Sequence, residues 1–70
     1  MRQGVLVFDE RLDRMDIRFD LDEYYGGLHC GTAMDVFVHN RWVPTRIEME
    51  DDWYLAGVKA DVLTGLRVRI

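Results

Sequence analysis

Residues 34–58 (MDVFVHNRWVPTRIEMEDDWYLAGV) constrain the fold more than any other stretch, because apolar side chains recur there at every second position. This alternation is typical of strands with one buried face. A two-residue turn at Asn40–Arg41 would close an antiparallel hairpin, and a slip by one residue would turn the apolar set toward water. On the apolar face, the predicted facing pairs are Val38 with Val43, Val36 with Thr45, and Met34 with Ile47. On the other face, they are His39 with Trp42, Phe37 with Pro44, and Asp35 with Arg46.

Two stretches before this hairpin also have strand patterns. Val5–Phe8 is a short apolar run, which favours a buried strand. Residues 15–21 alternate strictly, whereas a helix would scatter their apolar side chains around its circumference. The alternation predicts Met15, Ile17, Phe19 and Leu21 on the core face, and Asp16, Arg18, Asp20 and Asp22 on a charged outer face.

The C-terminal third continues the pattern after an acidic loop. A three-residue loop at residues 50–52 places Trp53 and Leu55 on the core face, while a two-residue loop would place Tyr54 and Ala56 there. We favour the longer loop, because Trp53 and Leu55 bring more apolar area to the core. Residues 59–65 (KADVLTG) could form one helical turn that ends at the glycine. In the last predicted strand, Leu66, Val68 and Ile70 face inward, and Arg67 and Arg69 face outward.

These elements predict a mainly β fold in a single domain, residues 1–70. The expected architecture is a small SH3-like antiparallel barrel, or a strongly bent sheet, of five to six strands with one short helical turn near Asp61–Thr64. Closure is favoured because it removes edge strands, which a chain of 70 residues could not otherwise protect.

Charge and cysteine content narrow the classes of function. The net charge is −4, from thirteen acids and nine bases. Net acidity argues against direct nucleic-acid binding, which depends on neutralising phosphates, and it suits a larger basic protein as partner. A single cysteine excludes an internal disulfide and fits a reducing, cytoplasmic location. The sequence has neither the pattern of a signal peptide nor an apolar run of membrane-spanning length, so we expect no membrane contact.

Two groups of acids flanked by aromatic residues are candidates for partner binding. Acids can steer a basic protein toward the surface, and aromatic side chains can anchor it. Trp42, on the face of the hairpin opposite the core, adds exposed apolar area, which often marks a contact. The alternative is that these acids serve only to keep the loops of the protein soluble. The candidate residues are Asp20, Asp22, Glu23, Tyr24, Tyr25, Trp42, Glu48, Glu50, Asp51 and Asp52.

One adjacent pair, His29 and Cys30, has the chemistry of a zinc site. The other candidate ligands are Asp20, Asp22 and His39, and a metal would stabilise so small a core. The alternative is that Cys30 is a small buried residue and His29 lies on the surface. The chain has no phosphate-binding loop and none of the common hydrolase motifs, so we expect no enzymatic activity.

The segments YYGGLHCG, DVFV, RWVPTRIEM, DDWYLAG and GLRVRI together resemble a family of small proteins classed as a domain of unknown function. The resemblance covers residues 12–70 and implies an origin in phages and conjugative elements of Gram-positive bacteria. Small acidic proteins of such elements include anti-CRISPR inhibitors. The expected function is therefore counter-defence by binding a Cas9-like nuclease, and the alternative is a small nucleic-acid-binding β-barrel module.

Overall fold

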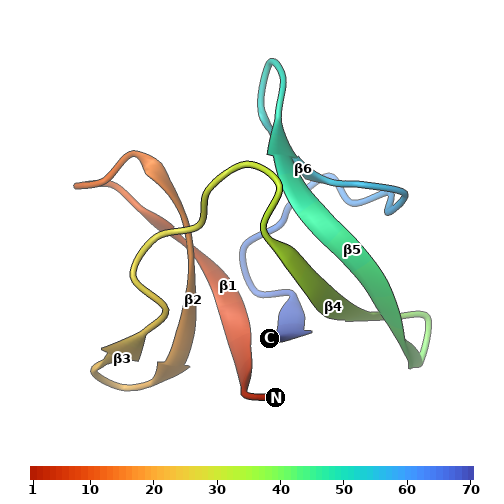
Figure 1. The fold of residues 1–70 in the computed structure, drawn as a ribbon, viewed down its shortest axis with the longest axis horizontal. Coiled ribbons are helices and arrows are strands. Elements are labelled where there is room, and N and C mark those ends of the chain that lie inside the picture. Colours follow the sequence, from red (N-terminus) through yellow and green to blue (C-terminus); the bar gives the residue numbers. More distant parts are fainter.

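The computed structural model describes all residues 1–70, which form seven antiparallel strands and no helix (Figure 1). The structure thus contains no helix that is long and apolar enough to cross a membrane. The strands lie in one open sheet in the order β3-β2-β1-β7-β4-β5-β6. Their bounds are β1 (Gln3–Asp9), β2 (Arg14–Asp20), β3 (Glu23–Tyr24), β4 (Ala33–Val38), β5 (Arg41–Met49), β6 (Trp53–Leu55) and β7 (Arg67–Arg69).

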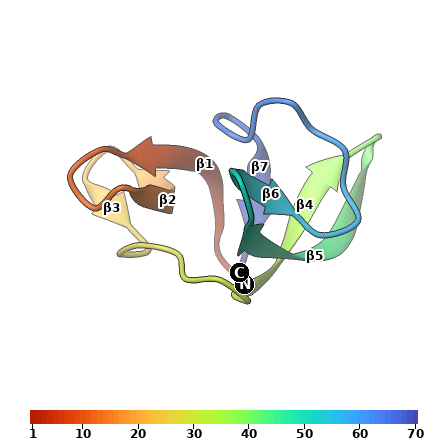
Figure 2. The same ribbon diagram turned by 90° about the horizontal axis from the view of Figure 1, so that it is seen from above.

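The last strand joins two hairpins that are otherwise separate in the sheet. One hairpin is β1–β2 with β3 at its edge, and the other is β4–β5 with β6 at its edge. β7 pairs with β1 on one side and with β4 on the other (Figure 2). The two chain ends consequently lie together, and Arg2 and Ile70 exchange two backbone hydrogen bonds of 2.8 and 2.9 Å.

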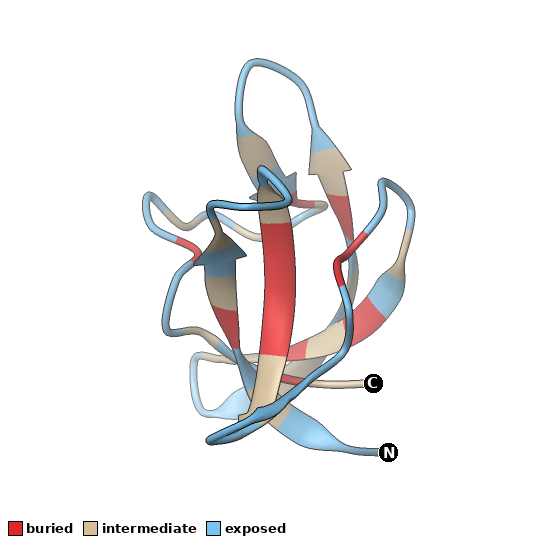
Figure 3. Ribbon diagram, turned by 90° about the vertical axis from the view of Figure 1, so that its left-hand side faces the viewer, coloured by how far each residue is buried: buried red, intermediate tan, exposed pale blue.

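The core lies between the inner faces of the two hairpins, and buried positions recur along the middle of the strands (Figure 3). The core residues come from the inward side of the alternating strands, as expected for an antiparallel sheet with one solvent-exposed face. Its ten buried apolar residues are Leu6, Met15, Ile17, Leu28, Met34, Val36, Ile47, Leu55, Leu63 and Val68.

Several predictions from the alternation are confirmed. The fold is mainly β and antiparallel, and the loop between β5 and β6 contains three residues, since Met49 pairs with Trp53. Leu55 is buried and Trp53 packs against the core, as the longer loop requires. In β7, Val68 is buried between two outward-facing arginines.

The predicted register of the β4–β5 hairpin is wrong by one residue in the turn. The turn residues are His39 and Asn40, with φ of 52° and 67°, so that Val36 faces Val43 instead of Thr45. Two-residue hairpin turns of this kind need positive φ at both positions, and histidine and asparagine reach that region more readily than most residues. The shift keeps the same side chains on the apolar face and changes only their partners.

The closed barrel and the helical turn are also wrong. β3 and β6 are the two edges of an open seven-stranded sheet, rather than neighbours in a barrel of five or six strands. Residues 59–65 stay irregular, because a single helical turn carries the full cost of nucleation. The backbone of Gly65 and Leu66 instead extends the pairing of β1 with β7. The Gly65 N–H donates to the Leu6 carbonyl (2.8 Å), and the Leu6 N–H donates to the Leu66 carbonyl (2.9 Å).

Candidate functional site

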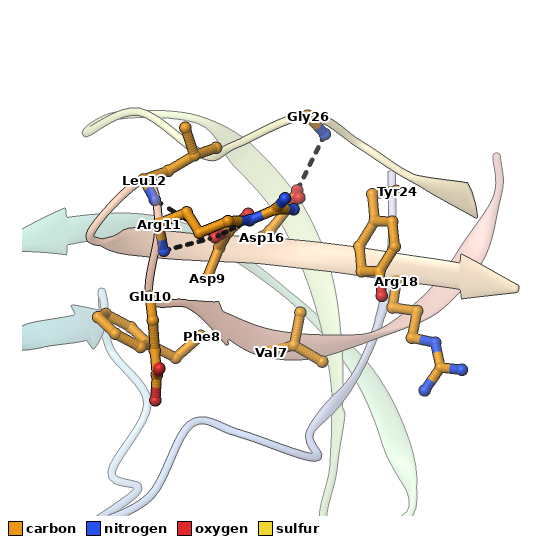
Figure 4. A pocket seen from close by; sticks show the side chains of 10 residues that line it. All are labelled: Val7, Phe8, Asp9, Glu10, Arg11, Leu12, Asp16, Arg18, Tyr24 and Gly26. Atoms are coloured by element: carbon orange, nitrogen blue, oxygen red, sulfur yellow. Dashed lines mark hydrogen bonds and ion pairs between the residues drawn. The ribbon is translucent and has the colours of Figure 1, made fainter. Parts of the chain in front are cut away.

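A pocket of about 570 Å³ lies beside the turn of the β1–β2 hairpin (Figure 4). The turn residues form one side and the segment from Tyr24 to Gly26 forms the other. The lining is mixed, with apolar side chains beside acids and arginines, and it contains no serine, cysteine or histidine. Its residues are Val7, Phe8, Asp9, Glu10, Arg11, Leu12, Asp16, Arg18, Tyr24 and Gly26.

Asp16, at the back of this pocket, is only 2% exposed, so its predicted place on a solvated outer face is wrong. One carboxylate oxygen, Oδ1, accepts the backbone N–H groups of Ile17 (2.8 Å), Gly26 (3.0 Å) and Gly27 (2.9 Å). The two glycines have φ of 112° and 102°, a conformation that lets successive N–H groups converge on one anion. Asp16 therefore fixes the segment that follows β3 against β2.

Six residues form a line across the outer face of the sheet, which we call the outer row. Strand pairing places Tyr24 beside Arg18, Arg18 beside Val5, and Val5 beside Arg67. Because Val68 faces Val36, the next step of the β4–β7 register brings Arg67 beside Phe37. Phe37 in turn faces Trp42. The outer row is thus Tyr24, Arg18, Val5, Arg67, Phe37 and Trp42, with one residue from each of β3, β2, β1, β7, β4 and β5.

Arginines of β7 lie over the aromatic end of the outer row. The guanidinium carbon of Arg67 is 5.5 Å from the centre of the Phe37 ring, and that of Arg69 is 4.5 Å from the Trp42 ring. The two rings meet edge to face with centroids 5.1 Å apart. Arg69 also pairs with Asp35 at 2.9 Å, where the sequence had predicted Arg46 as the partner. The aromatic residues that the hairpin pattern left exposed are therefore half-buried beneath arginines.

The two predicted acidic clusters lie at opposite edges of the sheet and do not form one surface (Figure 1). Asp20, Asp22 and Glu23 surround the β2–β3 turn with Tyr24 and Tyr25. Glu48, Glu50, Asp51 and Asp52 lie on the β5–β6 hairpin, and Trp42 belongs to neither group.

The acids of the two clusters also differ in whether they form ion pairs. Glu23 pairs with Arg2 (2.7 Å) and Glu48 pairs with Arg46 (2.8 Å). The carboxylates of residues 50–52 form no ion pair. The sequence could not show this difference, because it depends on which arginines the fold brings near each cluster.

The predicted zinc ligands are not brought together, since no group of three or more histidine, cysteine or acidic side chains has the geometry to hold a metal. His29 Nδ1 lies 2.8 Å from a guanidinium nitrogen of Arg14, which would repel a cation. Cys30 is exposed, so the alternative of a buried cysteine is wrong as well. Asp20 and Asp22 lie at the β2–β3 turn, and His39 lies in the turn of the other hairpin.

Comparison with known proteins decides the family. A family model described as "Domain of unknown function (DUF5348)" matches residues 4–70. The chain belongs to the DUF5348 family. A solved crystal structure of a protein from Ruminococcus gnavus is similar to the DUF5348 chain, with 58% sequence identity and a TM-score of 0.93 over 99% of this chain and 100% of that one. No curated protein matches. The resemblance to a family of unknown function is thus confirmed, and an origin in mobile elements stays a prediction.

Removal of the thiol tests the corrected view of Cys30 in this DUF5348 chain. We expect Cys30→Ser to change the free energy of unfolding by less than about 0.5 kcal/mol, because the side chain is exposed and makes no hydrogen bond. A metal chelator should leave the melting temperature of the wild-type protein unchanged. A fall on chelation that Cys30→Ser reproduces would restore the zinc hypothesis.

Two features of the DUF5348 site were missed from the sequence. In the sequence, Asp16 looks like any other charged residue of an alternating strand. The only indication is the Gly26–Gly27 pair, whose backbone N–H groups donate to the Asp16 carboxylate in the fold. The outer row was missed because the position of β7 between β1 and β4 was not predicted. Without that position, Arg67 could be assigned to the outer face but not to a place beside Phe37.

Proposed function

We propose that this protein is a non-enzymatic protein-interaction module that binds a larger basic protein through the tip of its β5–β6 hairpin. The acidic tip consists of Glu50, Asp51 and Asp52, flanked by Met49 and Tyr54. The observation that carries the proposal is that these three carboxylates are exposed and form no ion pair with the chain's own bases. The tip also projects from the body of the fold (Figure 1).

The composition of the acidic tip suits docking into a positively charged groove. Unpaired carboxylates attract a basic surface from a distance and raise the rate of association. Met49 and Tyr54, each 42% exposed, provide apolar area that a partner can bury, and methionine adapts to irregular surfaces. A narrow hairpin can enter a groove that the whole domain could not.

A Cas9-like nuclease is the partner that we propose, because such enzymes hold nucleic acid in a positively charged channel. The biological role would then be counter-defence of the anti-CRISPR type, on behalf of a mobile genetic element. The support for this role is the family resemblance of the sequence together with the charge of the acidic tip. The acids of the β2–β3 turn are weaker candidates, since Glu23 is already paired with Arg2.

Neutralising the acidic tip tests the proposal. The triple variant Glu50→Gln, Asp51→Asn, Asp52→Asn should weaken binding to a purified Cas9-like nuclease roughly tenfold, mainly through slower association. The measurement is surface plasmon resonance at two salt concentrations, with the nuclease both free and loaded with guide RNA.

A matched control removes the same charge elsewhere. Glu10→Gln, Asp22→Asn and Asp61→Asn change three exposed acids that form no ion pair and lie outside the tip. This control should bind nearly as well as the wild type. Equal weakening by both triple variants would show that only net charge matters and would overturn the tip as the docking site. No association of the wild-type protein with the nuclease in either state would overturn the choice of partner.

A further inference from the structure

We infer that the outer row is a binding site for single-stranded nucleic acid, on a surface distinct from the acidic tip. The row combines two arginines without acidic partners, three aromatic side chains and one valine, and it contains no carboxylate. It crosses the centre of the sheet on the face opposite the core. This inference goes beyond the proposed protein partner and does not depend on it.

Four of the eight arginines of this protein form ion pairs, and the other four, which are Arg14, Arg18, Arg41 and Arg67, form none. Arg2, Arg46 and Arg69 lie 2.7–2.9 Å from a carboxylate, and Arg11 lies 3.9 Å from that of Asp9, so each of the four has an acidic partner. Arg18 donates only to the carbonyls of Asp20 (3.2 Å) and Leu21 (3.4 Å), and Arg67 lies over the Phe37 ring. These last two keep a full charge for a phosphate. The net charge of −4 thus describes the whole chain, whereas the outer row itself contains two arginines and no acid.

The two ends of the row differ in the surfaces that they offer to a base. Tyr24 is 50% exposed at one end, whereas at the other end Phe37 and Trp42 are half-buried and the guanidinium groups of Arg67 and Arg69 lie over their rings. A guanidinium that rests on a ring, as Arg67 does on Phe37, offers a further plane for a base. Neighbouring strands are about 4.8 Å apart, so six residues span about 24 Å, which is enough for several nucleotides. Bases stacked inside a duplex could not reach these side chains.

The position of the row favours a nucleic acid over an acidic peptide. An extended peptide usually adds to a sheet at a free edge, where backbone groups lack partners. The outer row instead runs across β2, β1, β7 and β4, whose backbone groups are already paired on both sides. Binding there must use side chains alone, and spaced aromatic rings serve bases better than they serve carboxylates.

The direct test is fluorescence anisotropy with a labelled single-stranded DNA of about ten nucleotides, with a duplex of the same sequence as comparison. We expect binding of the single strand only, with a logarithmic salt slope of about −1.4, as two phosphate contacts would give. Arg67→Gln should reduce the slope to about −0.7, because one contact is lost. Tyr24→Ala should weaken binding about fivefold or more through lost stacking.

Arg41→Gln is the matched control, because Arg41 is an exposed, unpaired arginine at the β4–β5 turn and outside the row. It should leave the salt slope unchanged, and the melting temperature of each variant shows whether it is folded. If Arg67→Gln does not fold, Arg18→Gln removes the other row arginine and takes its place. Three results would overturn the inference: no binding of the single strand, equal weakening by Arg41→Gln, or displacement of the DNA by an oligoglutamate peptide at equal phosphate and carboxylate concentration.

Discussion

Asp16→Ala is expected to lower the free energy of unfolding by about 3–5 kcal/mol, because three backbone N–H groups lose a charged acceptor at once. The N–H of Gly27 is buried in this arrangement and that of Gly26 is partly buried, so water replaces the lost bonds only in part. Folded domains of ordinary size have only about 5–15 kcal/mol in total, so the variant should be close to unfolded.

Chemical denaturation followed by tryptophan fluorescence measures the change. Asp16→Asn keeps an oxygen acceptor without the charge and should lose less than the alanine variant. Asp20→Ala is the control on the same strand, since its exposed carboxylate accepts a single N–H, from Leu21 at 2.8 Å, and its loss should cost under about 1 kcal/mol. If Asp16→Ala were no more harmful than Asp20→Ala, the role of Asp16 in fixing the Tyr25–Leu28 segment would be contradicted.

Gly4→Ala is expected to destabilise the fold by about 2–3 kcal/mol, although alanine normally suits a strand better than glycine does. A methyl group at residue 4 would lie 2.5 Å from the Arg18 carbonyl oxygen and 2.7 Å from Cγ2 of Ile17. The first of these atoms is backbone, so the clash can be relieved only by moving β1 away from β2. Residue 4 also pairs with Val68, so that movement would disturb both neighbours of β1.

Thermal unfolding by circular dichroism gives the measurement for this variant. Gln3→Ala, at the adjacent exposed position, should stay within about 0.5 kcal/mol of the wild type. A Gly4→Ala protein that melts at or above the wild-type temperature would show that the two strands are less tightly apposed than the structure has them.

Local sequence patterns were sufficient where burial alone decides the conformation. The alternation of residues 15–19 and 34–47 identified the core faces correctly, and Leu55 and Val68 were placed inward for the same reason. The prediction for Leu21 was wrong, because β2 ends at Asp20 and the Leu21 side chain is 74% exposed in the β2–β3 turn. The exact partners across the β4–β5 hairpin were not recoverable. Turns at His39–Asn40 and at Asn40–Arg41 bury the same side chains, and the choice depends on which residues accept a positive φ.

The candidate sites were less predictable, because they depend on contacts between distant segments. An alternating pattern assigns Asp16 to the outside, and only the return of Gly26 and Gly27 beside β2 makes a buried carboxylate tolerable. Similarly, the acids at residues 50–52 and at residues 20–23 look equivalent in the sequence. The fold separates them by bringing Arg2 to one cluster and leaving the other without a base.

The central position of β7 also determines the order of events during folding. The β1–β2 and β4–β5 hairpins are local and can form within about 1–10 μs, whereas β7 must find β1 across nearly the whole chain. Until it does, β1 and β4 each present an unpaired edge to solvent, the arrangement that invites pairing with another chain. The β7 of a second molecule fits the same gap. The strand that completes the native sheet is therefore also the segment through which two copies could exchange strands.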